Sequence, residues 1–286
     1  MPELPEAQTI AQDLDGSLRG SSVARTELLF RPSLAGTMPL SELHGRAFTG
    51  AARRGKCVIL RFGDLSLLAS LRMTGQFVFG RSPGSGEGGP AGGKGKRSWP
   101  PHVRAALVLD GFEGPEGEDS LMFRDIRKFG RLHVCRPADE EALLPASARG
   151  RDVTELSPEE FHSRLASSGA PLKVALMDQG VMAGLGNIYA TEILFEAGVS
   201  PFRPAASLSR HESDIILEAA RSILDQAVRM RGSTVSNYQA PLGPGSYQEL
   251  HKAYGKAGKP CPRCGTTLEK VRAAGRTTVF CPLCQK

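Results

Sequence analysis

Four cysteines near the end of the chain constrain its fold more than any other feature. Two residues separate Cys261 from Cys264, two separate Cys281 from Cys284, and sixteen lie between the pairs. This spacing is typical of a tetrahedral zinc site with two thiolate ligands from each of two knuckles. About thirty residues bury too little apolar surface to fold unaided, so a bound zinc ion is expected to supply their folding energy. Redox-active dithiols are the alternative, although redox chemistry does not require two matched pairs.

Positive charge is concentrated in the same segment. The chain carries a formal net charge of +6, and residues 251–286 contain eight Lys or Arg against one Glu, hence +7. The other 250 residues carry 28 basic and 29 acidic side chains, hence −1. A compact basic module favours contact with a polyanion, because each neutralised phosphate releases counterions. A solvated, solubilising surface remains the other interpretation.

Composition is that of an ordinary globular protein. Hydrophobic residues make up 40% and charged residues 23%, which excludes a disordered, collagen-like or coiled-coil chain. No apolar run approaches the roughly 20 residues that span a bilayer, and the first residues lack the apolar core of a signal peptide. We therefore expect a cytoplasmic protein with no membrane partner. Cys57 and Cys135 lie in apolar stretches and are expected to be buried small hydrophobes.

The apolar pattern changes along the chain. Residues 3–19 predict a helix with one apolar stripe, and the short β-like runs within 22–137 are typical of a sandwich or barrel. A helical pattern follows, with capping boxes that begin at Ser157 and Ser209. The Gly-, Ser- and Pro-rich residues 81–98 predict a flexible insertion between strands.

The second residue, Pro2, has two interpretations. Removal of the initiator methionine, which is normal before a small residue, leaves a free secondary amine. An α-amino group titrates near pH 8 and a lysine near 10.4, so roughly a tenth of the former is unprotonated at pH 7. Such an amine attacks an aldehydic carbon and forms an iminium. Taken alone, Pro2 is better explained as the start of the first helix, where proline is favoured.

Six ordered motifs make the sequence resemble the family of formamidopyrimidine-DNA glycosylase and endonuclease VIII, which act in base excision repair. The resemblance runs nearly end to end, and the motifs together are far more specific than any one of them. They are Pro2–Glu6, Arg53–Lys56, Leu71–Gly75, Asp125–Gly130, the stretch from Met177 to Glu192, and the cysteine hairpin.

The resemblance implies an α+β multidomain fold. Its parts are an N-terminal β-sandwich flanked by helices (1–150), a helix-two-turn-helix domain (151–250) and a C-terminal zinc-finger β-hairpin (251–286). It also implies a bifunctional DNA glycosylase and AP lyase that removes oxidised purines, such as 8-oxoguanine and formamidopyrimidines, from damaged double-stranded DNA. One structural zinc ion and no catalytic metal are expected, in a monomeric bacterial protein associated with the nucleoid.

The motif residues receive their roles from the resemblance. Pro2 would attack C1′ of the damaged nucleotide, Glu3 would move protons at the sugar ring oxygen, and Glu6 would support the site. Lys56 is expected to contact phosphate near the lesion, and Lys173 to take part in processing the damaged base. Without the motifs, each lysine would be interpreted as an exposed charge.

The other assignments concern DNA contacts. Met73, Arg127 and Phe129 would fill the gap that a flipped base leaves, with Arg127 opposite the estranged base. Taken alone, Met73 and Phe129 would be predicted as core residues. Asn187 and Arg276 are expected to hold the phosphates around the lesion, and Arg276 is counted as catalytic with Pro2, Glu3 and Lys56. His102 is expected to contact the DNA backbone.

Two departures from the family pattern concern substrate range. Ser70 stands where many relatives have a histidine, and Ser236-Asn237-Tyr238 replaces the triplet that opens the lesion-capping loop. We still assign Tyr238 to the DNA-contacting residues. Two alternative functions stay open: an endonuclease VIII-like enzyme for oxidised pyrimidines, and a non-catalytic DNA-binding zinc protein. The Pro2–Glu6 start opposes the first, and the joint occurrence of Pro2, Glu3 and Lys56 opposes the second.

Overall fold

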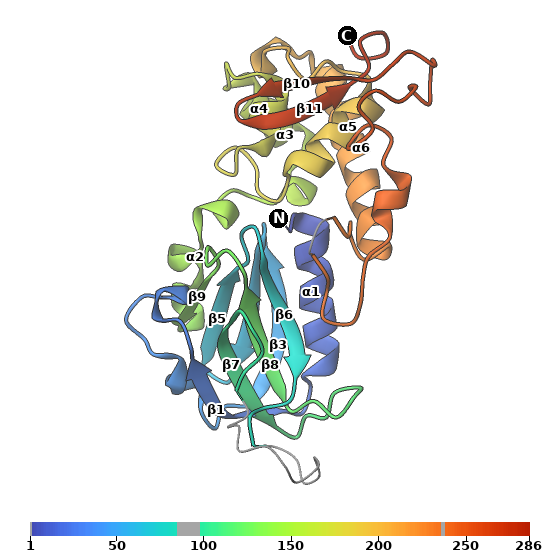
Figure 1. Cartoon of the computed structure of the whole chain (residues 1–286). Helices are drawn as coiled ribbons and strands as arrows, with labels where there is room; N and C mark the ends of the chain where they lie inside the picture. Colours follow the sequence, from blue (N-terminus) through green and yellow to red (C-terminus); the bar gives the residue numbers. More distant parts are fainter. Residues whose placement is uncertain (1, 85–97, 236–237) are drawn as a thin grey trace.

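The computed structural model describes residues 2–84, 98–235 and 238–286. Most of the predicted insertion at 81–98, and Ser236 and Asn237, therefore lie outside the described residues. A strand-rich half and a helix-rich half meet where the chain begins, and a β-hairpin lies at the far end of the helical half (Figure 1). Among the described helices, none is both long enough and apolar enough to cross a membrane.

Two sheets form the strand-rich half, as predicted. The first has the order β1-β7-β8-β6 and is antiparallel: β1 (Ser22–Leu28), β7 (Val103–Asp110), β8 (Ser120–Asp125) and β6 (Gly75–Gly80). The second has the order β2-β9-β5-β4-β3, with β2 parallel to β9: β2 (Leu34–Ala35), β9 (Arg131–Cys135), β5 (Leu65–Ser70), β4 (Cys57–Phe62) and β3 (Phe48–Arg54). The first helix, α1 (Leu4–Ser17), packs on β3 and β4.

Strand β4 is buried on both faces. Its side chains alternate, so Val58 and Leu60 point into the main core between the sheets and α1. Cys57 and Ile59 point the other way and pack with Leu144, which follows α2 (Glu140–Leu143). The buried cysteine at this position confirms the prediction that it is a small hydrophobe, and Cys135 lies in the same small cluster.

Four helices surround the second core. They are α3 (Pro158–Ala166), α4 (Leu172–Met177), α5 (Asn187–Ala197) and α6 (Arg210–Arg229). Both predicted capping boxes are present: the N–H of Glu160 donates to Ser157 Oγ (3.2 Å) and the N–H of Ser157 to the Glu160 carboxylate (3.0 Å). Leu4 of α1 also packs in this core, so the first helix joins the two halves.

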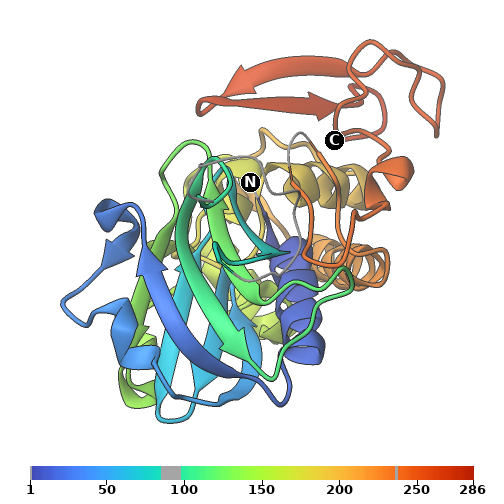
Figure 2. The same ribbon diagram turned by 60° about the horizontal axis from the view of Figure 1, so that its bottom comes forward.

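The hairpin consists of β10 (Glu269–Ala273) and β11 (Arg276–Phe280). Figure 2 shows it as an arm that extends out from the helices. Its base packs on Phe195 of α5, and the buried carboxylate of Glu192 accepts hydrogen bonds from the N–H groups of Lys252 (2.8 Å), Ala253 (3.0 Å) and Tyr254 (2.6 Å). Helix α5 therefore holds the hairpin in place relative to the junction between the halves.

Candidate active site and nucleic-acid interface

A cleft of about 670 Å³ lies at the junction between the strand-rich and the helix-rich half. Its walls come from the start of α1, the β3–β4 and β5–β6 connections, the segment between the halves, the loop before α5, and the hairpin. Both ends of the chain thus contribute to one site. Six residues predicted from the sequence line the cleft: Pro2, Glu3, Lys56, Met73, Asn187 and Arg276.

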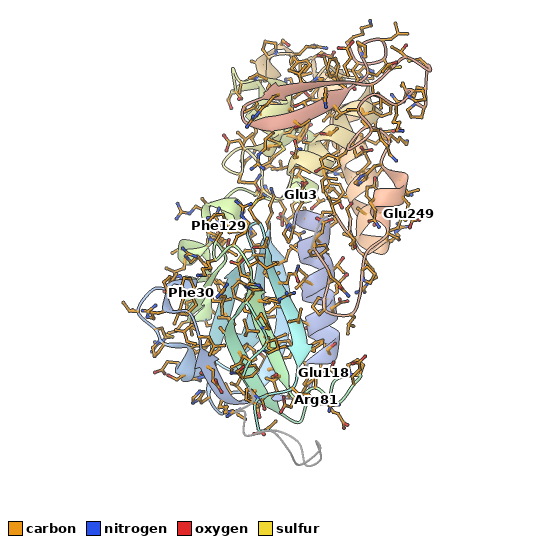
Figure 3. All side chains as sticks on the ribbon, in the orientation of Figure 1. Glu3, Phe30, Arg81, Glu118, Phe129 and Glu249 are labelled. Carbon is orange, nitrogen blue, oxygen red and sulfur yellow. The ribbon has the colours of Figure 1, made fainter. Side chains whose placement is uncertain are left out.

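Glu3 precedes α1, and its carboxylate lies against the first turn of α5. One oxygen accepts from the N–H groups of Gly186 (2.8 Å) and Tyr189 (3.3 Å), and the other from Ile188 (2.9 Å). Free amides and the helix dipole stabilise a carboxylate at a helix N-terminus. Glu3 is only 3% exposed and lies in the cleft wall. Pro2, beside it, is also buried and lines the same cleft. Figure 3 shows Glu3 where the two halves meet.

Glu6 lies behind Glu3, outside the cleft lining. Its carboxylate accepts hydrogen bonds from the N–H groups of Glu3 (2.8 Å) and Ser233 (2.7 Å) and from the Tyr189 hydroxyl (2.6 Å). Burial, and then the charge of Glu3, raises the pKa of Glu6. These contacts fix the backbone of Glu3 and join α1 to α5 and to the segment after α6.

Both predicted lysines are buried, so their interpretation as exposed charges is wrong. Lys56 lies in the β3–β4 turn, and burial lowers its pKa; the charges of Glu3 and Glu6 oppose that shift. Lys173 of α4 donates from Nζ to Thr278 Oγ1 (3.1 Å) and to the carbonyl of Thr277 (3.3 Å). Burial lowers the pKa of Lys173 to about 8. It lies behind the hairpin, in a small pocket that it shares with Arg276.

Arg276 and Asn187 reach the cleft from two elements held together by their packing. Arg276 begins β11, directly after the hairpin turn, where Gly275 has a φ of +73°. Asn187 is the first residue of α5, and its buried Oδ1 has no hydrogen-bond partner among the described residues. A buried amide oxygen without a partner is costly unless a ligand or water supplies a donor. The Oδ1 atom of Asn187 is therefore an acceptor in the cleft wall without a partner among the described residues.

The three residues predicted to enter a gap in DNA lie in two loops at one end of the sandwich. Met73 follows β5 and is 37% exposed. Phe129, labelled in Figure 3, lies between β8 and β9, and it is 49% exposed. The alternative that both are core residues is therefore wrong. The guanidinium of Arg127 stacks over the Phe129 ring, 4.8 Å from its centroid. Of the three, only Met73 lines the cleft.

The structure does not bring His102 or Tyr238 to the cleft lining. His102 is exposed in the turn before β7 with a φ of +71°. Tyr238 is only 7% exposed, and its hydroxyl donates to the carbonyl of Glu6 (3.2 Å). The ring reaches α1 because the chain after α6 runs back along that helix, where the N–H of Leu242 donates to Asp13 (3.1 Å). Contact between the Tyr238 ring and DNA would require this segment to move.

Sequence reasoning missed several residues of the cleft. Arg149 lines it from the segment between the halves, and no motif pointed to it. Gln179 lies in the motif from Met177 to Glu192, but the motif gave it no role. Its amide donates to the carbonyls of Met177 (2.7 Å) and Leu185 (2.8 Å), which closes the loop before α5. The cleft lining also includes Arg72 and Tyr254.

A buried ion pair joins the Lys56 turn to the segment between the halves. Asp152 accepts from the Arg53 guanidinium (2.8 Å) and from the N–H of Gly55 (3.1 Å). Arg53 belongs to the motif that ends at Lys56, so the motif was the sequence signal for one partner of this ion pair. Its partner lies about a hundred residues further along the chain, which the sequence alone did not reveal.

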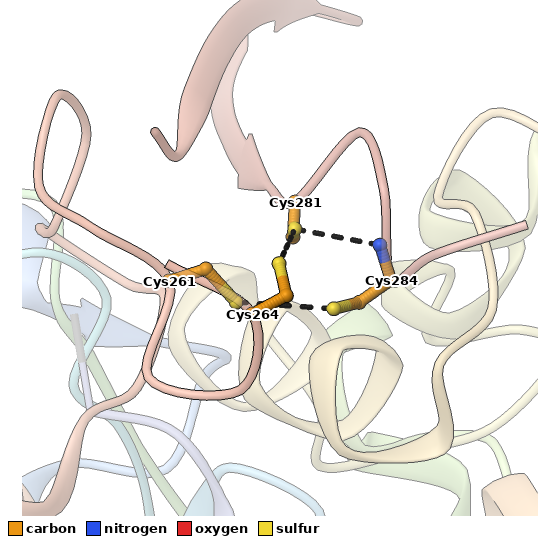
Figure 4. A group of neighbouring side chains, drawn as sticks. All are labelled: Cys261, Cys264, Cys281 and Cys284. Atoms are coloured by element: carbon orange, nitrogen blue, oxygen red, sulfur yellow. Dashed lines mark hydrogen bonds between the residues drawn. The ribbon is translucent and has the colours of Figure 1, made fainter. Parts of the chain in front are cut away.

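The four predicted cysteine ligands form one cluster at the base of the hairpin (Figure 4). Their Sγ atoms all lie within 4.8 Å of one another. A tetrahedral zinc ion with Zn–S bonds of about 2.3 Å separates its sulfurs by about 3.8 Å, which agrees with this spacing. The N–H groups of Arg263 and Cys284 already point at sulfurs, at 3.5 and 3.4 Å. The cysteines therefore fit one structural zinc ion.

Comparison with known families gives three matches along the chain. Residues 1–132 match the formamidopyrimidine-DNA glycosylase N-terminal domain, residues 150–239 its H2TH domain, and residues 258–286 a zinc finger found in FPG and IleRS. These ranges overlap the three predicted domains, whose exact borders stay predictions. The α+β fold of sandwich, helical domain and zinc-finger hairpin is confirmed.

Relatives match over the full length. A formamidopyrimidine-DNA glycosylase of Bacillus cereus is 36% identical over 100% of this chain and 99% of its own, and that of Thermus thermophilus is 38% identical over 100% and 98%. The crystal structure of Thermus thermophilus MutM (Fpg) has a TM-score of 0.84 at 36% identity, covering 99% of this chain and 98% of its own. Lactococcus lactis Fpg in complex with DNA containing an abasic site has a TM-score of 0.85 at 28% identity, with 99% of both chains covered. The chain belongs to the formamidopyrimidine-DNA glycosylase family.

Proposed function

We propose that this protein is a bifunctional DNA glycosylase and AP lyase that removes oxidised purines from double-stranded DNA, with the amine of Pro2 as its nucleophile. The observation that carries the proposal is that Pro2, Glu3 and Lys56 line one cleft together with Asn187 and Arg276. Lactococcus lactis relatives have been crystallised with DNA that contains Fapy-dG or an abasic site, which supports damaged DNA as the partner.

The chemistry begins once Met1 has been removed. The lone pair of the Pro2 amine attacks C1′, the bond between C1′ and the base breaks, and the base leaves with that electron pair and takes up a proton. Glu3, beside Pro2, moves the proton at the sugar ring oxygen as the ring opens and a covalent iminium forms on the proline nitrogen. Elimination of the 3′ and then the 5′ phosphate follows, and water releases the remaining sugar fragment from the amine.

The other cleft residues bind and hold the DNA in this proposal. Lys56 and Arg276 supply positive charge for the phosphates beside the lesion, and Asn187 supplies its side-chain amide at the start of α5. The buried Lys173 contacts β11 behind Arg276 and so supports the hairpin from which Arg276 projects. Met73, Arg127 and Phe129 form what we call the wedge, the three side chains that replace the flipped base in the stack.

Borohydride trapping tests the nucleophile. With damaged duplex DNA we expect a reduced covalent adduct, and peptide mapping should find the added sugar on Pro2. Intact-mass spectrometry first establishes that Met1 is absent. The control is Pro2→Gln, in which a larger second residue retains Met1, and this variant should give no adduct. An adduct on Lys56 or Lys173, or no adduct with any lesion, contradicts the proposal.

A lesion panel tests the substrate range in the same assay. The Pro2–Glu6 start and the complete wedge favour 8-oxoguanine opposite cytosine over thymine glycol. Glu3→Gln should abolish removal of 8-oxoguanine and of thymine glycol alike, because it takes away the group that moves the proton. A preference for thymine glycol would instead assign this chain to the oxidised pyrimidines. Unchanged activity of Glu3→Gln would contradict the mechanism.

A further inference from the structure

The two loops that carry the wedge meet at one buried carboxylate. Asp125 ends β8 and is completely buried. Its Oδ2 accepts a hydrogen bond from the N–H of Gly130 (2.7 Å), and its Oδ1 accepts one from the N–H of Arg127 (3.2 Å). Both ends of the loop that holds Arg127 and Phe129 are therefore bound to the same side chain.

The other loop is bound to the same oxygen. Thr74, directly after Met73, donates its hydroxyl to Asp125 Oδ1. The same hydroxyl oxygen accepts a hydrogen bond from the N–H of Arg127 (3.0 Å). Thr74 and Asp125 thus connect the backbone of Met73 to the backbone of Arg127 through side-chain hydrogen bonds, although the two loops are about fifty residues apart in the sequence.

A third turn is joined to this point through the Asp125 backbone. The N–H of Asp125 donates to the carbonyl of His102 (2.9 Å), and Arg104 donates from Nε to the carbonyl of Asp125 (2.8 Å). Arg72, His102 and Lys128, one residue in each of the three turns, have φ values of +53°, +71° and +62°. Non-glycine residues rarely adopt such angles, so the surrounding contacts must hold these turns in shape.

Gly130 closes the second loop directly against the core. A Cβ atom at this position would lie 2.5 Å from Cζ of Phe123 and 3.1 Å from Asp125 Oδ2. The chain therefore passes close to the carboxylate, and the loop that carries Phe129 cannot shift away from Asp125 without losing the hydrogen bond at Gly130.

We propose that Asp125, through Thr74, is the positioning residue that makes Met73, Arg127 and Phe129 enter the duplex as one rigid wedge. The inference rests on the proposed function and deepens it. Side chains that open a base step must resist the stacking of the neighbouring bases. Two loops that yield separately would resist poorly, whereas loops joined at a buried carboxylate move only together. Asp125 itself touches no DNA in this proposal.

Thr74→Val and Thr74→Ser form the matched pair that tests the inference. Valine has nearly the shape of threonine without its hydroxyl, and serine keeps the hydroxyl. The first readout is removal of 8-oxoguanine from duplex DNA. The second is the fluorescence of 2-aminopurine placed beside the lesion, which rises when the step is unstacked. The third is imine trapping on a single-stranded oligonucleotide with an aldehydic abasic site, which presents no stack to open.

For Thr74→Val we expect duplex excision about 10- to 100-fold slower, since small misplacements of positioning groups cost that much. The 2-aminopurine signal should fall with it, and trapping on the single strand should stay within about twofold of the parent protein. Thr74→Ser should behave like the parent in all three assays. Asp125→Asn, which turns an acceptor into a donor facing N–H groups, should follow Thr74→Val, with the exposed Asp110→Asn as its control.

Two results would overturn the inference: equal behaviour of the valine and serine variants, or an equal loss in the duplex and single-strand assays. The second would mean a general loss of structure. Failure of the proposed function is a separate result, because then the parent protein would give no adduct on either substrate.

Discussion

Glu3 and Glu6 are one helical turn apart, yet their surroundings differ. Three amides of the loop and first turn of α5 hold the Glu3 carboxylate in the cleft wall. Glu6 faces away from the cleft and bonds to Glu3, Tyr189 and Ser233, and its raised pKa follows from burial beside another carboxylate. One residue of the pair can therefore meet a substrate, while the other fixes its position.

Gly186 lies directly against the Glu3 side chain and leaves no space for a Cβ atom. A Cβ atom there would lie 2.4 Å from Glu3 Cδ, so Gly186→Ala must displace the carboxylate. We expect base removal to slow by about 10- to 100-fold and the free energy of unfolding to drop by about 1–3 kcal/mol. Single-turnover excision and urea unfolding measure the two effects. Gly169→Ala, where no atom lies within 4 Å, is the control. Normal excision by Gly186→Ala would show that the carboxylate needs no such close fit.

At the scale of elements, α5 connects the chemistry to the zinc finger. Its first turn holds Glu3 and presents Asn187, and its buried Glu192 holds the segment that leads into the finger. Local signals predicted the elements themselves well: proline and the capping boxes give the helix starts, and a short, nearly continuous apolar run gives β4. The contact of Glu3 with α5 was not predictable, because 183 residues separate Glu3 from Gly186 and only tertiary packing joins them.

His251 lies where the helical domain meets the finger segment, and we expect it to make the stability of this junction depend on pH. Its Nε2 is 3.0 Å from Ser233 Oγ, its ring packs on Tyr247 and Tyr254, and the nearby charge that acts on it is Lys256. Burial, and then Lys256, lowers its pKa to about 4. Between pH 6.5 and 4 the unfolded chain therefore binds a proton that the folded chain does not.

The free energy of unfolding should consequently fall as the pH drops through this range, and His251 should account for about 1–3 kcal/mol of the loss. His251→Gln keeps a hydrogen-bonding side chain but does not titrate there. Urea unfolding at pH 7 and pH 4.5 should show a smaller decrease for the variant than for the parent protein. Acid release of zinc affects both proteins alike, so the comparison isolates His251. Equal decreases would contradict the lowered pKa, because they would mean that the folded protein binds this proton as readily as the unfolded chain does.

The cleft is a property of the whole molecule. The sandwich contributes Lys56 and Met73, the helical half contributes Asn187, and the finger contributes Arg276. Sequence motifs identified these residues, but the excess charge in residues 251–286 did not show which cation faces the site. Arg149 shows the limit most clearly, because its place in the cleft depends only on how the two halves pack together.

We expect the fold of the finger to depend on zinc, so removing the metal should abolish the finger's contribution to DNA binding while the sandwich stays folded. A strong chelator is expected to unfold the hairpin, withdraw Arg276 and the basic side chains around it, and weaken damaged-duplex binding by about tenfold or more, since each lost phosphate contact lowers affinity. The sandwich has its own core, so emission from the one tryptophan, Trp99, which bonds to Glu27, should stay unchanged. Added zinc should restore binding.

Cys284→Ser, which removes one zinc ligand, should behave like the chelated protein. Cys57→Ser, which changes a buried cysteine that is not a ligand, should still bind zinc. Full affinity of the metal-free protein would mean that the sandwich and helices alone bind the DNA.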